Sequence, residues 1–341
     1  MLIDKSLIGD MSLAAAAAAH HAEEVGFDGV WATESVTDAF LQALAATMET
    51  ERIQVGTAIA VAFARNPMNV AYNAWDLAAA SDGRFVLGLG TQVKAHIERR
   101  FSMPWGQPTA RMADFVRALR AIWHAWSTGE RLNYEGEFYR HTLMSPVFTP
   151  ALHNHAIPIA IAAVGPQMTR VAGEVCDGAI LHGMANAAYL DEVALPALQE
   201  GLNASGRTRD DVFLSCPLFL IMGDDDQTIE DLRTKTRGQY AFYASTPAYR
   251  PCLDVIGYGD LQPELRELSR RGEWQEMGRM IDDDLLAKVA IEGTPEDMPR
   301  LVTERFGGRL DRVSSYFGWP VDDPDRLREI LANFHSTTAD A

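Results

Sequence analysis

Short apolar runs alternate along the chain with amphipathic segments of helical period. Such runs predict strands, because strands buried on both faces of a parallel sheet are almost continuously hydrophobic. The predicted strands lie at 2–3, 27–32, 53–61, 84–90, 159–163, 178–181, 212–222 and 311–317. A helical segment follows each strand, and this alternation is typical of parallel strands joined by helical crossovers.

Capping residues mark several of the helix boundaries. Asn66 before Pro67 is typical of a helix start, and Gly26 is typical of a helix end. The predicted helices span 12–25, 38–50, 67–81, 110–126, 167–175, 189–201 and 325–334, and another begins at Thr294. Two segments interrupt the alternation. Residues 129–157, rich in Gly, Pro, His and aromatic residues, predict a hairpin-like or lid-like insertion, and 226–288 predict a helical insertion of two or three helices.

Eight strand–helix units in 341 residues predict an α/β fold, a (β/α)8 TIM barrel with insertions that forms a single domain over 1–341. The competing fold is an open, doubly wound sheet. That fold would place a GxGxxG motif after the first strand. The residues there are Gly9, Asp10, Met11 and Ser12, which do not match.

The charge and the cysteine content of the chain limit the binding partners and the cellular location that we expect. The chain has 30 basic and 47 acidic residues and a formal net charge of −17. An acidic surface repels phosphate backbones and anionic lipid, so we expect no nucleic acid and no membrane partner. The alanine-rich run at 14–19 lacks the basic residues that precede a signal peptide. Three distant cysteines without a CxxC argue against a disulfide framework or zinc site and fit a cytoplasmic location.

Loops after the C-terminal ends of barrel strands carry function in such folds. Glu34 follows the second strand and is either a carboxylate that exchanges protons with a bound ring or a solvated acid. His96 after the fourth strand and His182 after the sixth are acid–base candidates or ordinary surface and core residues. Gly165 and Pro166 open a helix directly after the fifth strand. Free amides there could hold a phosphate, or the pair is a plain turn.

Six stretches together resemble the luciferase-like monooxygenase superfamily. They are GFDGVWATE at 26–34, RNP at 65–67, SDGRFVLGLG at 81–90, AAVGP at 162–166, AGEVCDG at 172–178 and IEGTPE at 291–296. They span nearly the whole chain in order. The sequence most resembles the branch that uses coenzyme F420, a deazaflavin hydride carrier, and QVKAHIERRF at 92–101 resembles an uncharacterised subgroup of that branch.

The resemblance implies a luciferase-like barrel with the deazaflavin across its C-terminal mouth. It places Glu34 against the ring system and a non-proline cis peptide behind the ring, between Ala58 and Ile59. The other implied cofactor contacts are Val61, Thr91, Gln92 and His96 for the ring side and Val164, Gly165, Gln167 and Met168 for the phosphate.

Two positions depart from the family pattern. Ser35 stands where relatives often carry a histidine proposed as a catalytic base, and Val93 stands where some relatives carry a glutamate that donates a proton. These departures make the sugar-phosphate chemistry of some relatives a poor expectation for this chain.

The sequence therefore predicts an F420-dependent oxidoreductase that transfers a hydride between the deazaflavin and a small organic substrate. The catalytic candidates are Glu34, Ser35, His96 and His182, and the candidate substrate contacts are Tyr243, Tyr249 and Arg250. Two alternatives stay open: a monooxygenase that uses reduced FMN, and a non-catalytic barrel that binds a flavin-like ligand or a protein. Because relatives often dimerise through their second and third helices, we also expect a homodimer.

Overall fold

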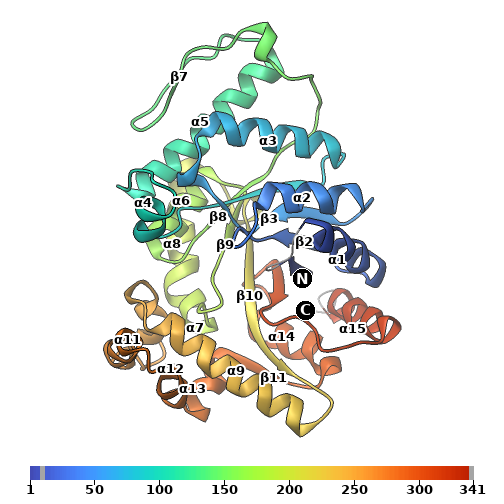
Figure 1. Cartoon of the computed structure of the whole chain (residues 1–341), viewed down its shortest axis with the longest axis vertical. Coiled ribbons are helices and arrows are strands. Elements are labelled where there is room, and N and C mark those ends of the chain that lie inside the picture. Colours follow the sequence, from blue (N-terminus) through green and yellow to red (C-terminus); the bar gives the residue numbers. More distant parts are fainter. Residues whose placement is uncertain (8–11, 338–341) are drawn as a thin grey trace.

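Parallel strands from both halves of the chain close one barrel (Figure 1). The computed structural model describes residues 1–7 and 12–337; Gly9, Asp10 and Met11, which entered the argument against a doubly wound sheet, lie outside them. The barrel strands, in spatial order, are β1 Leu2–Leu7, β2 Gly29–Ala32, β3 Gln54–Thr57, β5 Phe85–Gly90, β8 Ile159–Ala162, β9 Gly178–Ile180, β10 Phe213–Met222 and β12 Arg312–Ser315. Pairing of β12 with β1 completes the circle, so the predicted (β/α)8 barrel is confirmed.

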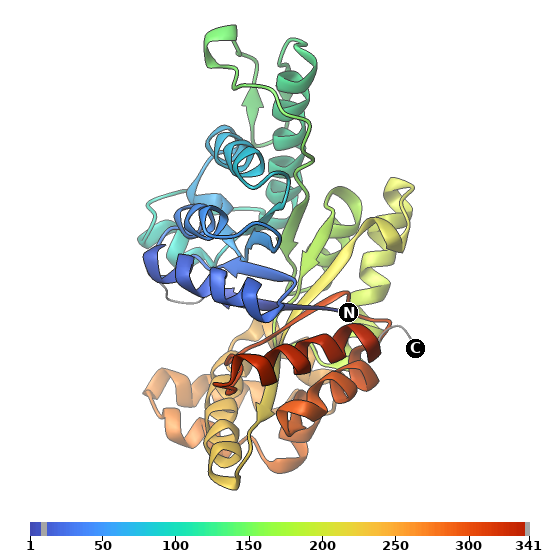
Figure 2. The ribbon, with the colours of Figure 1, turned by 90° about the vertical axis from the view of Figure 1, so that its right-hand side faces the viewer.

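Helices surround the strands (Figure 2). They include α1 Ser12–Val25, α2 Ala39–Met48, α3 Pro67–Ala80, α5 Pro108–Thr128, α6 Pro166–Val175, α8 Leu195–Ser205, α14 Met298–Phe306 and α15 Pro324–Thr337. The predicted start of α3 is confirmed: the Asn66 side chain accepts the Asn69 amide at 3.1 Å, and Pro67 takes the first helical position. In the described ranges, no helix is both long and apolar enough to cross a membrane.

A buried ion pair joins the first and last strands of the barrel. Arg312 donates from Nε and Nη2 to the two carboxylate oxygens of Asp4, at 2.8 and 2.7 Å, and both side chains are almost completely buried. Gly29 on β2 leaves room for this pair, because a Cβ there would lie 2.6 Å from an atom of each partner. A buried charge without its partner is costly, so the pair favours the observed register of β1 against β12.

The third predicted strand, 53–61, divides in two. β3 ends at Thr57, and β4, Ala60–Val61, pairs with the end of β5. Between them lies a non-proline cis peptide bond from Ala58 to Ile59, at the position that the resemblance implied. The sequence pattern does not reveal the division, because every residue of the run except Gln54 is apolar or small.

The second half of the chain departs further from the predicted pattern. β10 pairs in turn with β9, β12 and β11, and the sequence pattern does not mark β11 as a strand. A turn of π-helix, Leu190–Ala194, precedes α8, so the predicted helix at 189–201 is not regular. Elements that the prediction lacks or merges are α4 Lys94–Arg99, α7 Ala187–Tyr189, α9 Asp226–Ala244, α10 Arg250–Asp254, α11 Leu261–Arg271, α12 Trp274–Arg279, α13 Asp283–Val289 and β11 Ala290–Gly293.

Residues 129–157 form a small hairpin and an irregular return (Figure 1). The hairpin strands are β6 Tyr134–Glu135 and β7 Arg140–His141. Asp114 of α5 accepts the Phe138 amide at 2.7 Å, and Trp75 of α3 donates to the Ala151 carbonyl at 2.9 Å. The hairpin expectation is met, but these contacts place the segment against the helical layer and give no support to a lid over the barrel mouth.

Candidate functional site

The C-terminal ends of five strands bring most of the predicted site residues to one rim. All barrel strands are parallel, so their C-terminal ends lie on the same side of the barrel. The candidates that follow the ends of β2, β3, β5, β8 and β9 are Glu34, Ser35, Ala58, Ile59, Thr91, Gln92, Val164, Gly165 and His182.

Glu34 is held by donors of this chain itself. Its Oε2 accepts the Val61 amide at 2.8 Å, and Nη1 of Arg65 lies 3.0 and 2.8 Å from its two carboxylate oxygens. Arg65 also pairs with Asp38 at 2.5 Å. The Glu34 and Arg65 side chains are only 7% and 15% exposed. Glu34 therefore anchors β4 to the end of β2, and Arg65, which the sequence marks only as part of a helix start, is its partner.

The surface beside the cis peptide is apolar. Val61 is fully buried, while Ala58 and Ile59 keep partial exposure. Gly90 at the end of β5 lets Ile59 approach closely, since a Cβ on Gly90 would lie 2.6 Å from the Ile59 Cδ1 atom. An aliphatic face of this kind suits the flat ring of a flavin or deazaflavin, and the contact itself stays a prediction.

The turn into α6 is an open site for an anion. Gly165 caps the helix, and a Cβ on it would meet nothing within 4 Å. Pro166 has no amide hydrogen, and the amides of Met168 and Thr169 donate back to the Gly165 carbonyl at 3.1 and 3.0 Å. The first amides of a helix lack acceptors within it, so Gln167 presents its amide at the positive end of α6. This amide and the helix dipole suit one oxygen of a phosphate.

His182 is a partly buried, neutral imidazole two residues after the end of β9. Burial lowers the pKa of His182 from 6.5 to about 4. The Met184 amide donates to Nδ1 at 3.2 Å, which assigns the proton of the neutral ring to Nε2. The rings of Tyr243 and Tyr249 pack against it, with centroids 4.3 and 4.6 Å away. The two tyrosines predicted as substrate contacts thus contact His182.

A tyrosine pair extends this cluster to the end of β12. The hydroxyls of Tyr243 and Tyr316 are hydrogen-bonded to each other. Burial raises the pKa of both Tyr249 and Tyr316, so both phenols stay protonated and can donate. Tyr316 is not among the residues predicted from the sequence, although its place near the end of the eighth predicted strand, 311–317, was a usable signal.

The other catalytic candidates lie nearer the surface. His96 on α4 is exposed, and among the residues described its side chain has no hydrogen-bond or ion-pair partner. Ser35 is partly exposed, and its carbonyl accepts from Nη2 of Arg100 at 2.9 Å, which ties the end of α4 to the end of β2. Thr91 donates to the Gln92 carbonyl at 2.9 Å, and Gln92 has a left-handed φ of 60°. The structure shows no contact that joins His96 to the other candidates.

The rim offers no cluster of metal ligands. Within 1–7 and 12–337, no group of three or more His, Cys, Asp or Glu side chains is placed to hold a metal ion. The cysteines, Cys176, Cys216 and Cys252, are buried free thiols.

These features define an α/β-barrel protein whose candidate site lies at the C-terminal strand ends. The family model described as luciferase-like monooxygenase matches residues 13–308. The chain belongs to this family, and the resemblance seen in the sequence is confirmed.

Curated relatives match nearly the full length of the chain. An uncharacterised protein of Mycobacterium tuberculosis is 49% identical over 316 residues, covering 92% of this chain and 93% of the relative. A 5,10-methylenetetrahydromethanopterin reductase of Archaeoglobus fulgidus is 25% identical over 315 residues, covering 91% and 90%.

Solved structures share the fold. The F420-dependent tetrahydromethanopterin reductase of Methanopyrus kandleri superimposes with a TM-score of 0.77 at 20% identity, covering 97% of this chain and 96% of that one. The oxygenating constituent of 3,6-diketocamphane monooxygenase from Pseudomonas putida, solved with FMN, gives 0.67 at 16% identity, covering 100% and 98%. At these identities the likeness shows the barrel fold and no more.

Proposed function

We propose that this protein is an F420-dependent oxidoreductase that transfers a hydride between the deazaflavin and a small organic substrate. Membership of the luciferase-like family supports an oxidoreductase, and several relatives are named as F420-dependent enzymes. Bound F420 would supply the hydride chemistry, and the protein would position and shield the reacting partners.

The observation that carries this proposal is the open glycine turn at the start of α6. The cofactor phosphate would lie against Val164, Gly165, Gln167 and Met168, because the turn combines free space with the Gln167 amide at the positive end of α6. On the neighbouring strand ends, Ile59 would face the ring, with Thr91 and Gln92 beside it, and the fully buried Val61 would lie behind this face.

The structure supports different roles for the four catalytic candidates. Its low pKa makes His182 a poor proton acceptor at neutral pH, so we assign it a hydrogen bond from Nε2 to the substrate oxygen. Glu34 would hold the cofactor-facing segment in place through Val61 and Arg65. Ser35 and His96 stay the candidates for proton exchange, because solvent reaches both side chains.

A charge-matched pair of variants tests the phosphate site. Gln167 and Gln199 are both exposed glutamines on helices, and only Gln167 lies at the start of α6. An acidic residue in the first turn stabilises a helix, so Gln167→Glu should fold normally. We expect F420 binding, followed by fluorescence, to weaken at least tenfold in Gln167→Glu and to stay unchanged in Gln199→Glu. Equal affinities of both variants and the parent would contradict the proposed phosphate site.

Reduced FMN is the second candidate cofactor, and the FMN complex among the solved structures of this fold favours testing it. Titration with each cofactor and measurement of oxygen uptake separate the two. A protein that binds FMN but not F420 and consumes oxygen would be a monooxygenase. A protein that binds F420 tightly and turns over no substrate would be the non-catalytic barrel.

We propose that the protein forms a homodimer through α2 and acts in the cytoplasm. Leu41, Leu44 and Met48, spaced three and four residues apart, are 57%, 40% and 75% exposed on one face of α2. Analytical ultracentrifugation should show a dimer that Leu41→Glu dissociates; an unchanged dimer would place the interface elsewhere.

The buried free thiols fit a reducing compartment. The acidic surface favours neither nucleic acid nor membrane as a partner.

A further inference from the structure

We propose that the substrate carries a carboxylate on an apolar body, and that Lys235 binds this carboxylate in a cavity beside the barrel mouth. The inference rests on the proposed function in one respect, since it takes the cavity as the substrate side of the site. The place of the cavity, its charge, its apolar side chains and its connection to His182 support this inference.

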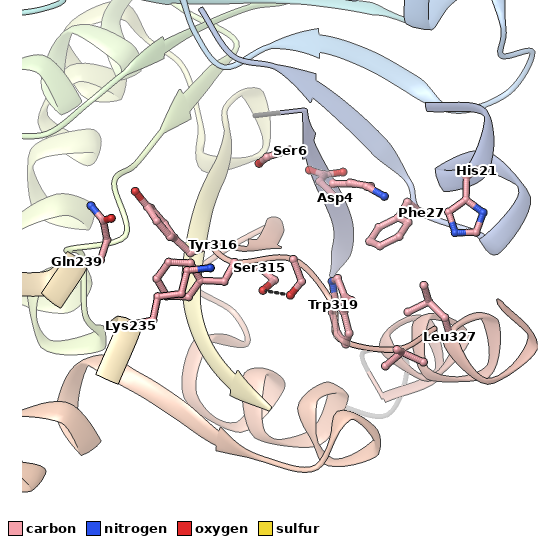
Figure 3. A pocket seen from close by; sticks show the side chains of 14 residues that line it. Asp4, Ser6, His21, Phe27, Lys235, Gln239, Ser315, Tyr316, Trp319 and Leu327 are labelled. Atoms are coloured by element: carbon pink, nitrogen blue, oxygen red, sulfur yellow. Dashed lines mark hydrogen bonds between the residues drawn. The ribbon is translucent and has the colours of Figure 1, made fainter. Parts of the chain in front are cut away.

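The cavity has a volume of about 620 Å³ and lies at the C-terminal ends of β1 and β12 (Figure 3). Small-molecule sites typically enclose about 300–1,000 Å³. Lys235 and Gln239 of α9 border it on one side, and Phe27 and Leu327 border it on the other. The volume therefore suits a small organic molecule that lies between α9 and the pair α1 and α15.

Charge in the cavity favours an anion, although the chain as a whole is strongly acidic. The one acidic lining residue, Asp4, is already neutralised by the two hydrogen bonds from Arg312. Nζ of Lys235 lies 4.4 Å from the centre of the Phe317 ring, and no carboxylate oxygen of the described chain lies within 4.0 Å of it. The Lys235 side chain is exposed at the border of the cavity, so its ammonium group can pair with a carboxylate that enters from solvent.

The remaining wall has both apolar and polar side chains. The apolar ones are Phe27, Phe317, Trp319, Val321 and Leu327, and the polar ones are Lys5, Ser6, His21, Gln239 and Ser315. The apolar side chains suit the body of an amphipathic acid whose carboxylate lies against Lys235.

Tyr316 connects the cavity to the proposed catalytic cluster. It lines the cavity, and its hydroxyl is bonded to that of Tyr243, whose ring packs on His182. A molecule anchored by its carboxylate on Lys235 would therefore direct its other end towards Tyr316 and the His182 side of the rim. Lys235 is thus a specificity-determining residue rather than a catalytic one.

Isothermal titration with 4-phenylbutyrate, and with 4-phenylbutanol as its neutral counterpart, tests the inference. We expect the acid to bind the parent protein more tightly than the alcohol and to bind less tightly as NaCl is added. Lys235→Met should weaken binding of the acid about tenfold or more and leave binding of the alcohol unchanged. The matched control is Lys288→Met, because Lys288 is also exposed on a helix and lies outside the cavity.

A second variant checks that the acid occupies this cavity. Gln239→Trp keeps the charge of Lys235 but fills part of the space, so it should weaken binding of both probes. Equal binding of acid and alcohol by the parent, or an unchanged affinity for the acid in Lys235→Met or Gln239→Trp, would overturn the inference.

Parallel titrations with F420 separate this inference from the proposed function. Binding of F420 without binding of the acid would refute the carboxylate site and leave the proposed cofactor in place. Binding of the acid that depends on Lys235, with no binding of F420, would support the site and refute the proposed cofactor.

Discussion

Replacement of Glu34 by alanine should lower the free energy of unfolding of the protein, independently of any effect on catalysis. The change removes the acceptor of the buried Val61 amide and one of the two carboxylates on Arg65. A buried amide without an acceptor costs about 1–3 kcal/mol, and a hydrogen bond to a charged group contributes about 1.5–3 kcal/mol. Because Arg65 keeps Asp38, we expect a total loss of about 3 kcal/mol.

Urea denaturation of the protein without cofactor measures this loss. Glu34→Gln keeps an acceptor for Val61 but loses the charge, so it should lose only about 1–2 kcal/mol. Ser35→Ala is the matched control, because the Ser35 side chain has no hydrogen-bond partner within the described chain, and it should unfold like the parent. If Glu34→Ala and Ser35→Ala unfolded at the same urea concentration, Glu34 would not be the anchor that the geometry indicates.

Two further predictions concern stability. His182 has a lowered pKa when folded, so the unfolded chain binds a proton that the native protein does not; stability should fall as pH decreases from about 6.5 to about 4, by about 3 kcal/mol. Urea denaturation at pH 7 and pH 4 measures this loss of stability. His182→Asn should lack this loss, so an equal loss in the parent and in His182→Asn would contradict the lowered pKa of His182. Gly29→Ala should lose about 3 kcal/mol or more, because its Cβ would lie 2.6 Å from Asp4 and Arg312. Gly238→Ala in α9, where a Cβ meets nothing within 4 Å, should gain about 1 kcal/mol, and equal denaturation midpoints for these two variants would refute the packing around Gly29.

Local patterns in the sequence predicted the fold well where a single segment carries the signal. The Asn66 and Pro67 cap and the apolar strand at 84–90 are of this kind, and the structure confirms both. The strand β11 is different, because it pairs only with the extended end of β10, and no periodicity in 290–293 reveals a partner about 70 residues away.

The site was harder to predict because its contacts join distant residues. Arg65 holds Glu34 across 31 positions, and Arg312 holds Asp4 across 308. Resemblance placed the cis peptide correctly, and the strand-end rule brought His182 to the rim. Neither the resemblance nor the strand-end rule indicates that Tyr243 covers His182, because that contact depends on how α9 lies after β10.

The most direct test of the central claim is a crystal structure of the protein grown with saturating F420. The account predicts density for the deazaflavin at the C-terminal strand ends, with its ring beside Ile59 and its phosphate at Gly165. Two results would contradict the account: density for F420 elsewhere on the protein, or side chains that fill the rim and leave no space for F420 at saturating concentration.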